Sequence, residues 1–318
     1  MTKLHIAYGD DYLDWRLGAN HPTNPERALL ATDLLINELG EDNIEIVLPE
    51  VDESDVEKLY SIHLPEYVDE VVYGGISNDW VGENKVLGVT ALKMFAGTAR
   101  LVEKMIAGEV KVAFNPQGAK HHAHYDYSNG FCVFNDLAWA GKEFAKAGLK
   151  AMYVDWDAHH GDGVEELLYN TPILTASIHD GTAYPGTGRD GHDEKSSVYN
   201  WALPAYSGDV EFCQAMDEIA KIADEYQPDV ILLATGADGH KTDPLASLQF
   251  DYDGYNYASN VIARIANKYA NGRVLIGGAG GYQPHTHTPA IWTEVVSTIY
   301  RSVTNPRLGV SDLTTTAK

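Results

Sequence analysis

Short apolar runs alternate with helical patterns along most of this chain, and this alternation limits the folds open to it. Strands that alternate with helices are joined by crossover connections, which make neighbouring strands parallel. The sequence therefore predicts an α/β fold with a mainly parallel central sheet. The apolar runs lie at Leu4–Tyr8, Ile44–Val47, Val110–Asn115, Ala151–Asp155, Ile173–Ile178, Val198–Leu203, Val230–Thr235 and Val274–Ile276. The helical patterns include Asn24–Glu38, Val89–Ala107, Asp136–Ala147, Val210–Tyr226 and Tyr255–Ala270.

Polar or glycine-rich segments follow several of the predicted strands. In open parallel sheets, ligands bind outside the carboxyl ends of the strands. We therefore expect these segments to converge on one site. They are His121 with His122, Asp155–Gly163, Ser177–His179, Gly236–Asp238 and Gly277–Tyr282.

The densest cluster, Asp155–Gly163, holds three carboxylates and two imidazoles. Charged residues are rarely buried without partners, and a divalent metal is the most economical partner for Asp together with His. Asp157 and His159 point the same way in an extended segment, and Asp238 is a third candidate ligand. This set suits catalytic Zn²⁺, with Fe²⁺, Mn²⁺ or Co²⁺ as alternatives. One such residue alone would more often be a turn or cap residue, so the prediction depends on their coincidence.

Two pairs of adjacent histidines, at 121–122 and 159–160, lie in the same clusters. Histidines that face a metal can activate water and protonate a leaving amine. Their remaining ring nitrogens need carboxylate partners, and Asp155 and Asp162 are available for this.

The glycine-rich segment Gly277–Gly281 directly precedes Tyr282. It lacks the Lys-Ser/Thr of a phosphate-binding loop, so nucleotide binding explains it poorly. Close approach of the backbone to a ligand explains the glycines better. A tyrosine hydroxyl presented there could stabilise an oxyanion.

The composition is strongly acidic, with 23 Lys and Arg against 46 Asp and Glu and a net charge of −23. This argues against direct nucleic-acid binding, which needs basic patches. It weakly favours cationic substrates, although acidity also simply keeps a protein soluble. The two cysteines, Cys132 and Cys213, form no disulfide framework and are expected to pack in the interior. No signal-peptide or membrane-spanning pattern is visible, so we expect a cytoplasmic protein with no membrane partner.

A set of motifs stands in order along the chain: His21-Pro22 with Pro25-Glu26-Arg27, His121-His122-Ala123, Gly130-Phe131-Cys132 with Asn135-Asp136, Asp155-x-Asp157-x-His159-His160-Gly161-Asp162-Gly163, Ser177-Ile178-His179, Pro185-Gly186-Thr187-Gly188, Gly236-Ala237-Asp238 with Asp243-Pro244-Leu245, and Gly280-Gly281-Tyr282. With them, the chain resembles the histone deacetylase-like zinc amidohydrolases of the arginase/deacetylase superfamily, from Leu4 to about Tyr300. This group includes acetoin-utilisation-type deacetylases and acetylpolyamine amidohydrolases. The resemblance implies a three-layer α/β/α fold, one deacetylase domain over residues 1–305, and a polar tail over residues 306–318.

The resemblance also implies two metal sites. Asp157, His159 and Asp238 would bind Zn²⁺, with Fe²⁺ or Co²⁺ possible in its place. A structural K⁺ would lie near Asp155, Asp157, His159 and Ser177, held partly through backbone carbonyls.

Catalytic roles follow from the same resemblance. His122, paired with Asp162, would be the general base and then the general acid. His121, paired with Asp155, would be its electrostatic partner, and Tyr282 would hydrogen-bond the scissile carbonyl.

The acyl-lysine channel is the third feature that the resemblance implies. Gly130, Phe131 and Tyr184 would form it, and Arg27 would line an inner pocket behind the metal. The family often has Gly just before the histidine pair, whereas this chain has Lys120, which we expect at the rim, where it would repel a cationic substrate.

The rim of the channel is less clearly marked. The carboxylate that grips the substrate backbone in the family has one candidate here, Asp79. His240, His285 and His287 are expected on rim loops, as ordinary surface histidines or as substrate contacts.

The function indicated is hydrolysis of the amide of N-acetyl-lysine, in a peptide or protein, or of a related acylated amine. An acetylpolyamine or other small acylated amine is the second choice, because the loop after Gly75 is modest in length for the channel-narrowing insertion of a polyamine enzyme. A catalytically silent acyl-ligand sensor is a further alternative, and a homo-oligomer is possible. An arginase-like ureohydrolase with two Mn²⁺ ions is disfavoured by Gly281-Tyr282 and the histidine pair.

Overall fold

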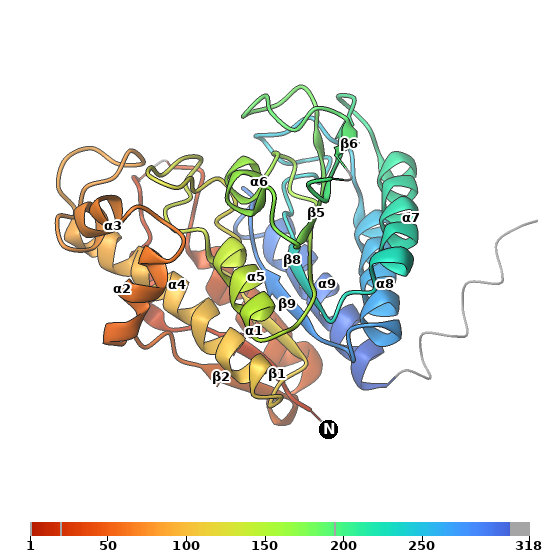
Figure 1. Cartoon of the computed structure of the whole chain (residues 1–318), viewed down its shortest axis with the longest axis horizontal. Helices are drawn as coiled ribbons and strands as arrows, with labels where there is room; N and C mark the ends of the chain where they lie inside the picture. Colours follow the sequence, from red (N-terminus) through yellow and green to blue (C-terminus); the bar gives the residue numbers. More distant parts are fainter. Residues whose placement is uncertain (1, 20, 194, 306–318) are drawn as a thin grey trace, which may run out of the picture.

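The computed structural model describes residues 2–19, 21–193 and 195–305, so the predicted tail at 306–318 lies outside the described residues. A nine-stranded sheet in the order β2-β1-β3-β9-β8-β4-β5-β7-β6 forms its centre (Figure 1). Neighbouring strands are parallel except for the antiparallel pair β6–β7. The strands are β1 Leu4–Ala7, β2 Ile44–Val47, β3 Val112–Asn115, β4 Ala151–Asp155, β5 Leu174–Asp180, β6 Gly191–Asp193, β7 Val198–Leu203, β8 Val230–Ala234 and β9 Val274–Gly277.

Helices cover the sheet in two groups (Figure 1). In one group α1, α9, α8 and α7 contact one another in that order, and in the other α4 contacts α2, α3 and α5, which contacts α6. The predicted three-layer α/β/α architecture is therefore confirmed. The α-helices are α1 Glu26–Leu39, α2 Glu53–Tyr60, α3 Pro65–Val72, α4 Lys85–Ile106, α5 Asp136–Lys146, α6 Asp162–Leu168, α7 Asp209–Tyr226, α8 Tyr252–Lys268 and α9 His287–Thr304, and two 3-10 helices span η1 Asp10–Asp14 and η2 Glu41–Asn43.

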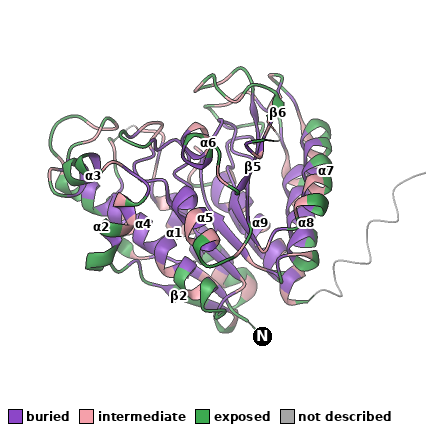
Figure 2. Cartoon of the chain, viewed as in Figure 1, coloured by how far each residue is buried: buried purple, intermediate pink, exposed green. Residues whose placement is uncertain are grey.

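The middle strands are buried along their whole length. Every residue of β3, β4, β8 and β9 is buried. Figure 2 shows the buried residues, in purple, gathered in the middle of the molecule. Parallel strands covered on both faces read as continuous apolar runs, which is why these strands were visible in the sequence. Because β3, β9, β8, β4 and β5 are neighbours in the sheet, the polar segments that follow them meet at one edge.

The sequence patterns placed most elements but not all. Strand β6 and helices α2, α3, α6 and α9 were not among those predicted. Helix α6 begins at Asp162, inside the polar cluster. Asp162 is flanked by Gly161 and Gly163, and because glycine has a low helix propensity the sequence shows no clear helix signal here. Helix α4 begins at Lys85, before the predicted Val89, because the side chain of Asn84 caps it by accepting from the N–H of Leu87.

No helix within residues 2–19, 21–193 and 195–305 combines the length and the apolar character needed to cross a membrane.

Candidate active site and metal centre

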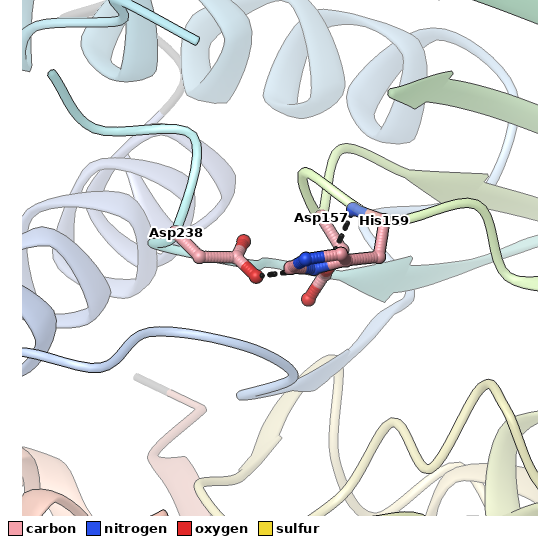
Figure 3. Close-up of side chains that lie close together, drawn as sticks. All are labelled: Asp157, His159 and Asp238. Atoms are coloured by element: carbon pink, nitrogen blue, oxygen red, sulfur yellow. Dashed lines mark hydrogen bonds and ion pairs between the residues drawn. The ribbon is translucent and has the colours of Figure 1, made fainter. Parts of the chain in front are cut away.

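Three predicted ligands meet where β4 and β8 end (Figure 3). One ligand atom each of Asp157, His159 and Asp238 lies within 4.8 Å of the others, and all three residues are buried. His159 Nδ1 lies 3.1 Å from Asp157 Oδ1 and 3.0 Å from Asp238 Oδ2. The structure thus brings together, from two separate strand ends, the donors that the sequence suggested.

Backbone N–H groups hold the other carboxylate oxygens of this cluster. Gly280 N donates to Asp157 Oδ2 at 2.6 Å, and Ala158 N donates to Asp238 Oδ1 at 2.9 Å. A Cβ atom at Gly280 would lie 2.1 Å from Asp238 Oδ2. The sequence favours close approach of the backbone to a ligand as the reason for the glycines after β9. In the structure, Gly280 instead approaches the carboxylates of Asp157 and Asp238.

The electrostatics of the cluster fit a divalent cation. Burial and the charge of Asp157 raise the pKa of Asp238 to about 7. Two carboxylates this close in a low-dielectric interior repel each other unless a positive charge lies between them. A set of two carboxylates and one imidazole, with further positions open, matches catalytic Zn²⁺ and also Fe²⁺ or Co²⁺.

The two predicted His–Asp pairs form beside this cluster. His121 Nδ1 lies 2.8 Å from Asp155 Oδ2, and His122 Nδ1 lies 2.7 Å from Asp162 Oδ1. Burial opposes protonation of His121, but the charges of Asp155 and Asp157 together with the hydrogen bond to Asp155 outweigh burial and raise the pKa of His121 to about 9. Burial and the neighbouring charge of His121 lower the pKa of His122 to about 4. The pKa values of the two adjacent imidazoles are thus shifted in opposite directions.

Tyr282 directly follows the glycine segment and lies beside the cluster, with its ring centroid 6.4 Å from that of His159. Its backbone N–H donates to Asp243 Oδ2 at 2.8 Å, and the preceding carbonyl of Gly281 accepts from Arg27 Nη1 at 2.8 Å. Burial raises the pKa of the Tyr282 hydroxyl well above its usual value. The hydroxyl therefore stays protonated and can donate. Asp243 was part of a sequence motif, but its positioning of Tyr282 was not foreseen.

A channel of about 370 Å³ leads to the cluster. The Phe131 N–H donates to Asp79 Oδ1 at 3.2 Å, and Phe131 has a positive φ of 65°. Asp79, the predicted rim residue, thus holds the backbone of Phe131, a residue of the channel wall. The channel is lined by His122, Asn129, Gly130, Phe131, His159, Tyr184, Leu245 and Tyr282.

Comparison with known proteins identifies the family. The family model "Histone deacetylase domain" matches residues 21–299. The chain belongs to the histone deacetylase family. It is accordingly a hydrolytic enzyme, an amidohydrolase of the deacetylase type.

Two relatives and one solved structure illustrate the similarity. The acetoin utilization protein AcuC of Bacillus subtilis (strain 168) is 31% identical over 319 residues, covering 93% of this chain and 81% of AcuC. A probable deacetylase of Archaeoglobus fulgidus is 33% identical over 294 residues, covering 87% of this chain and 80% of that protein. The crystal structure of the HDA15 HD domain matches with a TM-score of 0.81 at 24% identity, over 94% of this chain and 89% of that one, which supports the fold.

This histone deacetylase family member also has an inner pocket of about 20 Å³, which shares His122, Gly130, Phe131 and Tyr282 with the channel. That volume holds about one water molecule. Arg27, which donates to the Gly281 carbonyl, also lies over the ring of Trp292, 5.0 Å from its centroid. The lining residues include Thr23, Arg27, Lys120, His121, Cys132 and Tyr282.

The position predicted for Lys120 is wrong. Lys120 is buried, 7% exposed, and its Nζ lies 5.7 Å from the ring centroid of Trp15. The N–H groups of Ala119 and Lys120 both donate to the buried Asp136, at 3.1 and 2.9 Å, and this turn of the backbone directs the side chain inward. Burial lowers the pKa of Lys120 to about 8. Lys120 therefore cannot repel a substrate at the rim.

Two of the three histidines expected on rim loops, His240 and His287, differ from expectation. His240 is buried at 1% exposure and stacks on His287 with ring centroids 4.3 Å apart. His240 lies in the segment between β8 and α8 but is buried there, and His287 is the first residue of α9, so neither is a free surface histidine on a rim loop. His285 is exposed, with Nε2 3.7 Å from Glu26 Oε2.

Of the four residues predicted to surround K⁺, two lie on neighbouring strands, and Asp157 and His159 lie in the segment that follows β4. Asp155 of β4 and Ser177 of β5 are register partners. The Asp155 side chain accepts from Tyr153 Oη and from the N–H of Asp157, and Ser177 Oγ lies 2.9 Å from His179 Nδ1.

Proposed function

We propose that this protein is a zinc-dependent deacetylase that hydrolyses the amide of N-acetyl-lysine in a peptide or protein. The observation that carries the proposal is the joint placement of the Asp157, His159 and Asp238 donors, the His122–Asp162 pair and Tyr282 at the end of a 370 Å³ channel. Zn²⁺ held by those three donors would supply Lewis acidity toward the amide carbonyl and the attacking water.

His122 is assigned the proton transfers. Its Nδ1–H donates to Asp162, which leaves Nε2 free as the basic nitrogen. Because its pKa is lowered to about 4, His122 is neutral at neutral pH and can take a proton from water. The same nitrogen then returns that proton to the departing amine.

His121 and Tyr282 are assigned electrostatic roles. The pKa of His121 is raised to about 9, so it stays an imidazolium beside the reacting groups and stabilises developing negative charge. The Tyr282 hydroxyl, whose pKa is raised by burial, donates to the oxygen of the scissile carbonyl.

The channel is assigned the acyl-lysine side chain. Phe131 and Tyr184 give apolar walls that suit the lysine methylenes and exclude water, with Gly130 between the wall and His122. A Cβ atom at Gly130 would lie 2.4 Å from the His122 ring, so only glycine allows this approach. A structural K⁺ at Asp155, Asp157, His159 and Ser177, a single domain over residues 1–305, a cytoplasmic location and a possible homo-oligomer remain predictions.

Acetylpolyamine hydrolysis is the second candidate, since a net charge of −23 attracts small cationic substrates. Turnover of an acetyl-lysine peptide and of acetylspermidine by the zinc-loaded protein, with and without a hydroxamate chelator, separates the two. Hydroxamate-sensitive release from the peptide supports the proposal, and preference for acetylspermidine supports the second candidate. Bound zinc with no turnover of either would instead indicate an acyl-ligand sensor.

A further inference from the structure

The His122–Asp162 pair continues outward through two more residues. Asp162 Oδ1 lies 2.7 Å from His122 Nδ1, and its Oδ2 lies 3.2 Å from His124 Nε2. His124 Nδ1 in turn lies 2.5 Å from Glu166 Oε2. The side chains of His124 and Asp162 are 8% and 11% exposed, whereas Glu166 is 46% exposed. Three hydrogen bonds thus link the proposed catalytic histidine to the protein surface.

The spacing of these four residues in the sequence explains why their side chains meet. His122 and His124 are two positions apart on the segment after β3, and Asp162 and Glu166 are four apart on α6. Residues four apart on a helix share one face, so α6 presents both carboxylates to the same strip of the His122 segment.

Close docking of α6 keeps the two segments in register. The Val164 N–H donates to the His121 carbonyl at 3.0 Å. A Cβ atom at Gly163 would lie 2.3 Å from the Ala123 carbonyl oxygen, so glycine is required for this approach.

Independent contacts fix His124 itself. His63 Nε2 accepts from the N–H of Asn135 at 2.9 Å, so His63 Nδ1 carries the proton and donates to the His124 carbonyl at 2.8 Å. The His124 ring stacks on Tyr127 with centroids 4.3 Å apart and planes 12° apart. The ring is therefore held on its flat side as well as at both nitrogens.

The charge state of His124 matches this geometry. Burial opposes its protonation, but the hydrogen bonds to Asp162 and Glu166 outweigh burial and raise the pKa of His124. Each ring nitrogen faces a carboxylate, so both donate, and Asp162 accepts one hydrogen bond from each of two histidines. The two carboxylates of α6 are the charged groups that face the ring, with Tyr127 against its flat side.

We propose that His124 is a positioning residue for the proposed deacetylation. By holding Asp162 Oδ2, it fixes Oδ1 toward His122 Nδ1, which orients His122 Nε2 toward the channel. Glu166 in turn orients His124. This inference rests on the proposed function, and it requires no proton transfer along the chain of contacts, because the carboxylate only orients and stabilises the imidazole.

The test is a double-mutant cycle on the zinc-loaded protein with an acetyl-lysine peptide. His124→Ala should lower kcat by about 10- to 100-fold, with KM changed less than about twofold and zinc content unchanged. In an Asp162→Asn background, His124→Ala should not lower kcat any further, because the carboxylate that His124 orients has already lost its charge. His124→Gln, which places an N–H donor near the position of Nε2, should recover most of kcat.

Two outcomes overturn the inference while leaving the proposed function intact: an unchanged kcat in His124→Ala, or the same loss with and without Asp162→Asn. Absence of turnover by the wild-type protein overturns the proposed function and this inference with it. If His124→Ala fails to fold, Glu166→Gln replaces it in the cycle and should show a smaller loss of kcat that also disappears with Asp162→Asn. Glu143→Gln, a surface change on α5, is the matched control and should leave kcat unchanged.

Discussion

Gly280 and Asp157 are joined by a 2.6 Å hydrogen bond in which the glycine N–H donates to the carboxylate oxygen that does not face His159. This contact links the segment after β9 to the segment after β4. A hydrogen bond to the second oxygen of a metal-binding carboxylate orients it and strengthens the site. The proposed metal centre thus depends on a backbone contact from a residue that carries no side chain.

Gly280→Ala tests this dependence. Its Cβ would lie 2.1 Å from Asp238 Oδ2, so the carboxylates must move apart, and zinc affinity should fall at least 10-fold. Competition with a zinc-chelating dye measures the affinity. Gly18→Ala is the control, because its Cβ would meet nothing closer than His21 Cβ at 3.8 Å. Unchanged affinity in Gly280→Ala would contradict the assigned ligand geometry.

Asp238→Asn should abolish most zinc binding. In the metal-free protein it should also remove a buried negative charge that destabilises the folded state. The pKa of Asp238 is raised to about 7 by burial and by the charge of Asp157, so above that pH its charge destabilises the folded state. The metal-free variant should therefore melt at or above the temperature of the metal-free wild type at pH 8, and zinc should raise its melting temperature far less. A zinc-induced shift equal to that of the wild type would remove Asp238 from the ligands.

Tyr282→Phe should lower kcat by about 100- to 1000-fold with little change in melting temperature, since only a hydroxyl is removed. Steady-state kinetics on an acetyl-lysine peptide, with zinc content measured in parallel, check this. Near-normal kcat at full zinc occupancy would show that the hydroxyl does not stabilise the oxyanion.

The burial of Lys120 should make the stability of the folded protein depend on pH. Its pKa is lowered by burial from 10.5 to about 8, so the unfolded chain binds more protons than the folded one between pH 8 and 10.5. The unfolding free energy of the wild type should then rise across this window relative to Lys120→Met, by up to about 3 kcal/mol. Urea unfolding at several pH values measures the unfolding free energy, with Lys221→Met, at an exposed position of α7, as the control. A pH-independent difference between wild type and Lys120→Met would contradict the buried, destabilised ammonium.

The sequence predicted the sheet and the convergence of its strand ends because both depend on local patterns. The buried runs of β4 and β8 are continuous in the sequence, and Asp157 and His159 lie two positions apart in the segment that directly follows β4. Features that depend on contacts between distant segments were not accessible in the same way. The inward turn of Lys120 depends on Asp136, sixteen positions away.

The link from His124 to Glu166 was missed for the same reason, although weak signals existed. His124 repeats the two-residue spacing from His122, and Asp162 and Glu166 have helical spacing. Without knowing that α6 begins at Asp162 and docks on this segment, the two spacings could not be connected.

The most direct test of the central claim is the rate of acetate release from an acetyl-lysine peptide by one preparation of the protein, measured metal-free and after addition of one equivalent of Zn²⁺. The account predicts that zinc restores turnover in the wild type and that His122→Ala with full zinc occupancy stays inactive. Equal rates with and without metal, or full activity of zinc-loaded His122→Ala, would contradict it.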